Sequence, residues 1–565
     1  MKKAISILLS VLMLFSMVSV GVSAAEKEEL TITVANDLHY NLSYGNYSGT
    51  DYKKDDYSHV PGNGQLWIES LIIIDTFFEE FRQSESNILL IPGDLVDHGT
   101  KEEHAAFSKY LNDFEAATGK RIYVVPGNHD YYGKDKTTPA QFAEYYANFG
   151  YSEAIAKDPN SASYVAELEG DYRLLAVDSC KPGDGGSGID EERKAWIEEQ
   201  AKKAQKDGKK LISMMHHNML DHFILGEMLH PGAFVKSEIG LPELYAQYSV
   251  KYNFTGHTHS HDVKAYTGSN GVTIYDVLTA SLDLYPLPYR TVTFGDEVKI
   301  RTEKIEAVDM SSKEGIISDN CYKLATEDFQ AYALECANHG LNSVFDDYLS
   351  ASKIKSLLKI DEEANPEVCD VIDKVLPRFT ELINMPMYTG DAQGKENLEK
   401  HAKKLGLDFP ETDIGSFREL AIFFYQQYVE GDENFGLFSA EYVLLTASLT
   451  AILNQLLADV TAEDYATLLN YLASFFKLEG KVDALTQYAG DAVSRIKGID
   501  IFVSALGSSV LLYFTTDELP ADNNPTLPGY DIPVQEEVNL SLWDKIVNFF
   551  TSLFDYILRI FGVGQ

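Results

Sequence analysis

Acidic, amide and imidazole side chains recur in five short segments of the N-terminal half of the sequence. These side chains are Asp37, His39, Asp94, Asn128, His216, His257 and His259. Carboxylate and carboxamide oxygens combined with imidazole nitrogens suit zinc, manganese or iron. The set is too large for one four-coordinate ion. It predicts two metal ions about 3.5–4 Å apart that share one carboxylate, an arrangement used for displacement at phosphorus.

Each segment has a simpler interpretation when it is taken alone. Asp94 follows Pro92 and Gly93, and an aspartate in such a turn often caps the next helix. Asp97 is open to the same interpretation, and a single histidine is more often structural than a metal ligand. The secondary structure predicted before each segment is therefore needed to choose between the two interpretations.

Every one of the five segments directly follows an apolar run that is typical of a buried strand. These runs are residues 30–35, 87–91, 121–125, 210–215 and 250–254. Helical spacing of apolar residues predicts intervening helices, for example at 65–82, 101–117, 139–149 and 189–206. The alternation of strands with helices indicates the α/β class, in which ligands bind beyond the carboxyl ends of strands.

The five segments resemble the motifs of the calcineurin-like metallophosphoesterases, in the order found in that family. They are Asp37-Leu38-His39, Gly93-Asp94-Leu95-Val96-Asp97-His98-Gly99, Gly127-Asn128-His129-Asp130, Met215-His216-His217 and Gly256-His257-Thr258-His259. The resemblance covers residues 30–262. It implies a β-sandwich flanked by helices and a phosphoester hydrolase with two divalent or trivalent ions of manganese, zinc or iron.

The resemblance also assigns three ligands to each metal ion and one shared ligand. The ligands of the first ion are Asp37, His39 and His259. Those of the second ion are Asn128, His216 and His257. The shared, bridging ligand is Asp94. Two such ions make a hydroxide from bound water near neutral pH, and this hydroxide would attack phosphorus in line.

Three further side chains receive roles from the resemblance. His129 is expected beside the substrate, where it stabilises the transition state or protonates the leaving oxygen. Asp97 is expected to orient His129. His217, the second histidine of its pair, is expected to support the site or to contact the substrate.

Two departures from family patterns argue against particular branches of the family. Purple acid phosphatases carry tyrosine three residues after the bridging aspartate, where this chain has Asp97, so the chain resembles the non-purple branch. Exported 5′-nucleotidases usually carry glutamate where this chain has Asp130, which weakens a nucleotidase assignment. Phosphomonoesters and phosphodiesters both remain open as substrates.

The length and the net charge of the chain limit its possible domain organisation and its possible partners. The chain has 565 residues and a formal net charge of −39. Its length predicts at least two domains. The negative charge argues against nucleic acid and a bare anionic membrane as partners. A small phosphoester stays compatible, because metal charge dominates a site locally.

Five regions are predicted along the chain. They are a signal peptide at 1–24, the metallophosphoesterase domain at 30–308, an all-α domain at 311–515, a linker at 516–538 and an amphipathic C-terminal helix at 539–565. The N-terminus has a basic start, an apolar stretch and the small residues Val22-Ser23-Ala24 before a charged segment. This pattern favours a cleaved signal peptide over a membrane anchor. The protein is therefore expected to be secreted, extracellular or at the cell surface.

The C-terminal helix and the cysteines leave alternatives open. Charged residues interrupt the C-terminal helix too often for a transmembrane span, so it either docks or self-associates, or contacts a membrane or cell surface. The four cysteines show no CxxC spacing and are expected to be free thiols, although a bridge between Cys321 and Cys336 is an alternative. The alternative to an enzyme is a non-catalytic surface or interaction protein with a relict metal site.

Overall fold

The computed structural model describes residues 29–132, 137–222, 232–388, 396–431, 435, 439–458, 461–475 and 520–530. The predicted signal peptide and the predicted amphipathic C-terminal helix lie outside these residues. Among the helices within them, none combines the length and the apolar character that a membrane span requires.

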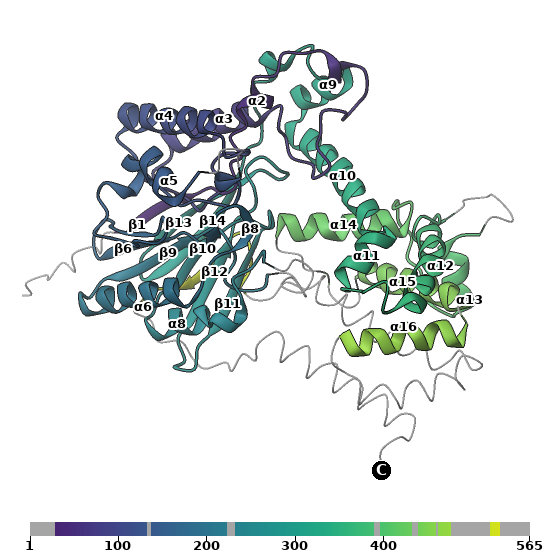
Figure 1. Ribbon diagram of the computed structural model, residues 1–565. Helices are drawn as coiled ribbons and strands as arrows, with labels where there is room; N and C mark the ends of the chain where they lie inside the picture. The colour runs from purple at the N-terminus through teal and green to yellow at the C-terminus, as the bar shows by residue number, and fades with distance from the viewer. Residues whose placement is uncertain are drawn as a thin grey trace, which may run out of the picture.

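Two β-sheets lie face to face (Figure 1), and all their strands except β15 come from the first part of the chain. One sheet has the strand order β15-β14-β13-β1-β2-β3, and the other has the order β11-β12-β10-β9-β6-β5-β4. The strands of the first sheet are β1 (Leu30–Val34), β2 (Ile88–Ile91), β3 (Arg121–Val124), β13 (Pro288–Phe294), β14 (Glu297–Lys304) and β15 (Thr526–Pro528). Those of the second are β4 (Ala156–Lys157), β5 (Tyr164–Glu167), β6 (Tyr172–Val177), β9 (Lys210–Met215), β10 (Tyr252–Thr255), β11 (Asp262–Thr267) and β12 (Thr273–Leu278). A small ribbon of β7 (Cys180–Lys181) and β8 (Asp184–Ser187) is separate.

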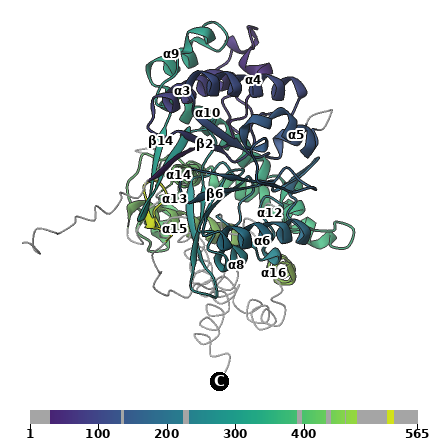
Figure 2. The same cartoon turned by 90° about the vertical axis from the view of Figure 1, so that its left-hand side faces the viewer.

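Helices cover the outer faces of the two sheets (Figures 1 and 2). Helices α3 (Ser70–Gln83), α4 (Lys101–Thr118) and α5 (Pro139–Tyr145) lie on one side, and α6 (Glu191–Lys206) and α8 (Leu241–Gln247) on the other. Side chains along β6 alternate between two apolar clusters, with Leu174 between the sheets and Leu175 against α6 and α8. This two-sided burial explains the continuous apolar runs in the sequence. The predicted α/β sandwich flanked by helices is confirmed.

The central strands run parallel in both sheets. In the first sheet β1, β2 and β3 are parallel neighbours, and in the second β6, β9, β10 and β12 are. The carboxyl ends of parallel strands share one edge of their sheet. Segments that follow five of these strands can therefore meet, although more than two hundred residues separate the first from the last.

A helical unit follows the sandwich, as predicted. Its helices are α9 (Asp319–Glu327), α10 (Phe329–Tyr348), α11 (Ala351–Leu357), α12 (Pro366–Ile383), α13 (Leu398–Lys404), α14 (Phe417–Glu430), α15 (Ala440–Ala458) and α16 (Ala462–Phe475). An apolar cluster of its own joins α12, α13, α14 and α15. The end of α14 reaches back to the sandwich, where the Tyr428 hydroxyl donates to the main-chain oxygen of His222 at 3.0 Å.

The boundaries between the two units differ from those predicted. Ile317, Phe329 and Tyr332 are buried in the core of the sandwich, so α9 and the start of α10 belong to it rather than to a unit that begins at residue 311. The predicted linker at 516–538 is also wrong for residues 526–528, which form β15 and pair with β14. Leu527 on β15 is 2% exposed and lies in the same core.

Three local elements differ from the prediction. The helix predicted at 65–82 begins only at Ser70, after a turn in which the main-chain N–H groups of Glu69 and Ser70 donate to the oxygens of Leu66 and Trp67. The helix predicted at 139–149 ends at Tyr145, and Gly150 follows with a φ of 107° beside the ring of Tyr164, where a β-carbon would not fit. Strand β11 was not predicted. All four cysteines are buried free thiols, as expected.

The packing of Leu527 predicts that β15 stabilises the sandwich. Leu527→Ala should lower the free energy of unfolding by about 2–5 kcal/mol, because it removes apolar contacts and leaves a cavity. Thr526→Ala is the matched control on the exposed side of the same strand, and it should change stability by less than about 0.5 kcal/mol. Urea denaturation measures both values. Equal effects of the two substitutions would show that residues 526–528 behave as a linker.

Candidate metal centre

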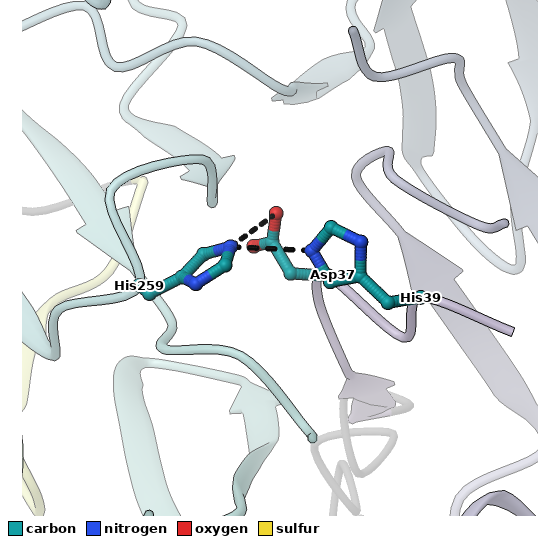
Figure 3. A group of neighbouring side chains, drawn as sticks. All are labelled: Asp37, His39 and His259. Carbon is teal, nitrogen blue, oxygen red and sulfur yellow. Dashed lines mark hydrogen bonds and ion pairs between the residues drawn. The ribbon is translucent and has the colours of Figure 1, made fainter. Parts of the chain in front are cut away.

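The loops after β1, β2, β3, β9 and β10 bring all seven predicted ligands together at the carboxyl edges of the two sheets. Asp37, His39 and His259 form one compact group, whose ligand atoms lie within 4.8 Å of one another. The Nε2 atoms of His39 and His259 are 3.2 Å apart, and Nε2 of His259 is 3.6 Å from Oδ1 of Asp37. Figure 3 shows the two imidazoles pointing toward the carboxylate from opposite sides.

A second group gathers around His216. Its Nε2 atom lies 3.3 Å from Oδ2 of Asp94, 3.2 Å from Nδ1 of His257 and 2.9 Å from Oδ1 of Asn128. Asp94, His216 and Asn128 are buried. One carboxylate, one carboxamide oxygen and two imidazole nitrogens thus converge on a common point.

Asp94 lies between the two groups. Its Oδ2 atom is 3.3 Å from Nε2 of His216 and 3.9 Å from Nε2 of His39. In a tetrahedral site with bonds of about 2.0–2.1 Å, neighbouring ligand atoms lie about 3.3 Å apart. The 3.2 Å separation of the His39 and His259 nitrogens matches that spacing. The residues fit metal ions on both sides of Asp94.

The backbone at the centre adopts a conformation that few residues tolerate. Nine non-glycine residues of the described chain have positive φ angles, and five of them are predicted ligands. Those five are Asp37, His39, Asp94, His257 and His259, with φ between 44° and 73°. Left-handed conformations at non-glycine residues are unfavourable and concentrate at functional sites. Here they turn the side chains inward at the strand ends.

His129 lies beside the ligands and is more accessible than they are. Its side chain is 30% exposed, and its main-chain N–H donates to Oδ1 of Asp94 at 2.8 Å. Burial opposes a charge on His129, but Asp94 and Asp97 raise the pKa of His129 above its ordinary value. The structure thus places an imidazole with a raised pKa next to the predicted bridging carboxylate.

Asp97 contacts His129 in a way that the sequence did not predict. The main-chain oxygen of Asp97 accepts from Nδ1 of His129 at 2.6 Å, whereas the carboxylate is 3.5 Å from that nitrogen. The carboxylate lies 3.3 Å from Nδ1 of His39, and its other oxygen accepts from Asn41 at 2.7 Å. Burial alone would raise the pKa of Asp97, but its contacts with His129 and His39 hold that pKa well below its ordinary value. Asp97 therefore holds His129 through its main-chain oxygen, and its carboxylate lies at ion-pair distance from His39.

Two buried carboxylates support the centre without having been predicted to do so. The Asp130 carboxylate accepts hydrogen bonds from the main-chain N–H groups of Leu95, Val96 and Gly127. These bonds hold the loops after β2 and β3 together. Asp283 lies behind His39 and accepts from Ser281 at 2.7 Å. The sequence contained Asp130 within a motif but gave no sign of its partners, and Asp283 lies outside every motif.

The structure places His217 behind the ligands rather than at an open surface. His217 is fully buried, its ring centroid is 4.4 Å from that of His257, and Ser179 lies 2.9 Å from its Nδ1. Burial and the neighbouring His216 lower the pKa of His217 to about 3, so its imidazole is neutral near pH 7. Of the two roles expected for His217, support of the site fits this position.

A comparison with models of protein families matches the part of the chain that carries the metal centre. Residues 30–261 match the family model described as calcineurin-like phosphoesterase. These residues form a calcineurin-like phosphoesterase domain. The match begins at β1 and ends just after His259, so it spans all the candidate ligands.

Two curated proteins resemble parts of this chain. A probable glycerophosphodiester phosphodiesterase, GpdQ, of Arcobacter nitrofigilis is 29% identical over 131 residues, which cover 23% of this chain and 41% of that protein. A 3′,5′-cyclic-nucleotide phosphodiesterase of a Nostoc species is 42% identical over 62 residues, which cover 11% of this chain and 21% of that protein. The chain thus spans less than half the length of the curated relatives it matches.

Solved structures also resemble part of this chain. A dimetal phosphatase from Danio rerio aligns with a TM-score of 0.35 at 12% identity, over 48% of this chain and 95% of that one. A purple acid phosphatase from yellow lupin, Lupinus luteus, aligns with a TM-score of 0.34 at 13% identity, over 49% of this chain and 52% of that one.

The protonation of two ligands predicts that metal binding to the phosphoesterase domain releases protons. Burial opposes charge on His39 and His216, but nearby carboxylates, chiefly Asp283 for His39 and Asp94 for His216, raise the pKa values to about 10 and about 9. Both imidazoles are therefore protonated at pH 7 without metal, and an ion must displace these protons to reach the nitrogens. Binding should release about two protons at pH 7 and weaken as the pH falls.

Isothermal titration calorimetry of the metal-free protein with Mn²⁺ tests this prediction. The apparent heat at pH 7 should depend on the ionisation heat of the buffer, because each proton that the ion displaces from an imidazole is taken up by the buffer. Heats that are independent of the buffer at pH 7 would contradict the predicted protonation of His39 and His216.

Proposed function

We propose that the protein is a metal-dependent hydrolase of phosphoesters. The observation that carries the proposal is the position of Asp94, whose carboxylate lies between two groups of metal-type ligands and next to His129. The family of the domain and the phosphodiesterase names of its two curated relatives support the same reaction class.

The ligand groups fit two metal ions, held by the residues described above with Asp94 shared. When bound, such ions activate water as a nucleophile and neutralise charge on phosphoryl oxygens. The protein's own contribution is a rigid arrangement, because Asp130 fixes the loop that carries Asp94 and the main-chain oxygen of Asp97 holds the ring of His129. Manganese, zinc and iron all suit the donor atoms.

His129 is suited to protonate the leaving oxygen. A main-chain carbonyl only accepts hydrogen bonds, so Nδ1 of His129, which lies 2.6 Å from the oxygen of Asp97, carries a hydrogen. Nε2 is then the nitrogen that gains or loses a proton. The raised pKa of His129 extends the protonated form, which is the form that a general acid needs, to higher pH.

The relatives' names make phosphodiesters the first substrates to examine. We propose this class because both relatives are named as phosphodiesterases. Phosphomonoesters require the same metal site and belong in the same panel. The ratio of the two activities then assigns the substrate class.

Hydrolysis assays test the proposed reaction. The protein loaded with Mn²⁺ or Zn²⁺ should hydrolyse bis-p-nitrophenyl phosphate or p-nitrophenyl phosphate. Asp94→Asn should lower kcat/KM by at least about a hundredfold, since it weakens a ligand that both ions share. Asp113→Asn, on the exposed side of α4, is the control and should leave the rate unchanged. No turnover of either ester by the metal-loaded protein would favour the alternative of a non-catalytic protein with a relict site.

The role of His129 predicts a dependence on the leaving group. His129→Ala should lower kcat about 10²–10⁴-fold for an ester of a simple alkyl alcohol, because a strongly basic leaving oxygen needs a proton. For a p-nitrophenyl ester the loss should be below about tenfold, since p-nitrophenolate leaves without one.

His98→Ala is the matched control, because His98 lies 3.3 Å from the other oxygen of Asp97 and its side chain is 43% exposed. That variant should show no dependence on the leaving group. Equal losses for both esters in His129→Ala would mean that His129 stabilises charge without donating the proton.

We also propose that the protein acts outside the cytoplasm, on small phosphoesters, with contact to a membrane or cell surface through residues 539–565. The basic start, apolar stretch and small-residue end of the N-terminus support export. N-terminal sequencing of protein recovered from the culture medium or cell surface tests this. Recovery of only cytoplasmic protein that begins at Met1 would overturn the proposal.

A further inference from the structure

Tyr132 is an exposed aromatic residue beside the candidate metal centre. Its side chain is 40% exposed, and its ring centroid lies 4.9 Å from that of His129. Its hydroxyl oxygen is 3.1 Å from Nδ2 of Asn128, which donates to it. Tyr132 therefore contacts the proposed general acid with its ring and a proposed metal ligand with its hydroxyl.

The contact with Asn128 has a chemical consequence, because the two ends of a carboxamide are not equivalent. The oxygen can bind a metal ion, whereas the NH₂ group is a hydrogen-bond donor and cannot. In the structure Oδ1 of Asn128 faces Nε2 of His216 at 2.9 Å, and Nδ2 faces Tyr132 at 3.1 Å. A rotation of the amide by half a turn would present the NH₂ group to the metal site.

We propose that Tyr132 is a positioning residue that selects the metal-binding orientation of Asn128. Its hydroxyl gives the NH₂ group an acceptor on the side away from the ligands, so the oxygen points toward them. The inference rests on the proposed two-metal site, in which Asn128 is a ligand of the ion near His216.

Gly185 on β8 leaves room for the Tyr132 hydroxyl, because glycine has no side chain. A β-carbon at residue 185 would lie 2.5 Å from the Tyr132 hydroxyl oxygen, which is too close for any side chain. The main-chain oxygen of Gly185 also lies 3.4 Å from Nε2 of His217, so this glycine borders the centre. A larger residue at 185 should push the hydroxyl away from Asn128 while both partners remain chemically intact.

Binding of Mn²⁺ alone to the metal-free protein tests the inference. Tyr132→Phe should weaken one Mn²⁺ site about 10–100-fold, the usual cost of losing a group that orients a metal ligand, and should leave the other site unchanged. Electron paramagnetic resonance titration resolves the two sites without an activity assay. The melting temperature of the metal-free protein should not change, because the residue is exposed and the ring is kept.

The matched control is Tyr47→Phe, which also removes one hydroxyl, here a donor to Asp51 at 2.7 Å on an exposed surface. Tyr47→Phe should leave both Mn²⁺ sites unchanged. Gly185→Ala should reproduce the defect of Tyr132→Phe. In the Tyr132→Phe background Gly185→Ala should add less than about twofold, because the hydroxyl that it would displace is already gone.

A double-mutant cycle with Asn128→Ala separates the possible failures. If Asn128→Ala weakens one Mn²⁺ site and Tyr132→Phe adds nothing further in that background, Tyr132 acts through Asn128 as proposed. If Asn128→Ala weakens a site but Tyr132→Phe alone does not, the inference about Tyr132 is overturned and the ligand set stands. If Asn128→Ala changes neither site, the proposed ligand set itself fails, and the inference fails with it.

Discussion

The metal centre depends on polar side chains that point inward from left-handed backbone, a conformation that non-glycine residues disfavour. Five of the seven candidate ligands have positive φ angles, and a left-handed conformation costs a non-glycine residue roughly 1–2 kcal/mol. The surrounding structure has to offset this cost. It does so through buried contacts that fix the loops, such as the three main-chain N–H groups that Asp130 accepts. These contacts hold the strand-end loops that carry the ligands.

Much of the centre could be predicted from sequence, for a physical reason. Strands that are buried on both faces, such as β2, show as continuous apolar runs, and the polar residues that follow them are forced to the sheet edge. The order of Asp94, Asn128 and His216 along the chain matches that of the calcineurin-like metallophosphoesterases, and this resemblance then indicated one site. The contacts behind the ligands could not be predicted from the sequence. Asp283 acts on His39, but it lies in the segment between β12 and β13, which carries no motif. Even Asp97 proved to act on His129 mainly through its main-chain oxygen.

The domain boundaries were harder to predict, because helical periodicity shows that a face is apolar and does not show what covers it. The apolar faces of α9 and α10 cover the sandwich near Ile317 and Tyr332, whereas those of α12 to α15 cover one another. Strand β15 gave no local signal, since three residues beside prolines are too few for an alternating pattern. Its partner β14 lies more than two hundred residues earlier in the chain.

The late position of β15 also affects the order in which the molecule assembles during synthesis. Strand β14 is an edge strand until Thr526–Pro528 arrives, and the whole helical unit is made in the interval. An unpaired edge exposes hydrogen-bonding groups that can recruit another chain. Strand β14 therefore stays open to pairing with another chain until β15 is made. The first sheet gains its last strand only after the helical unit has been made.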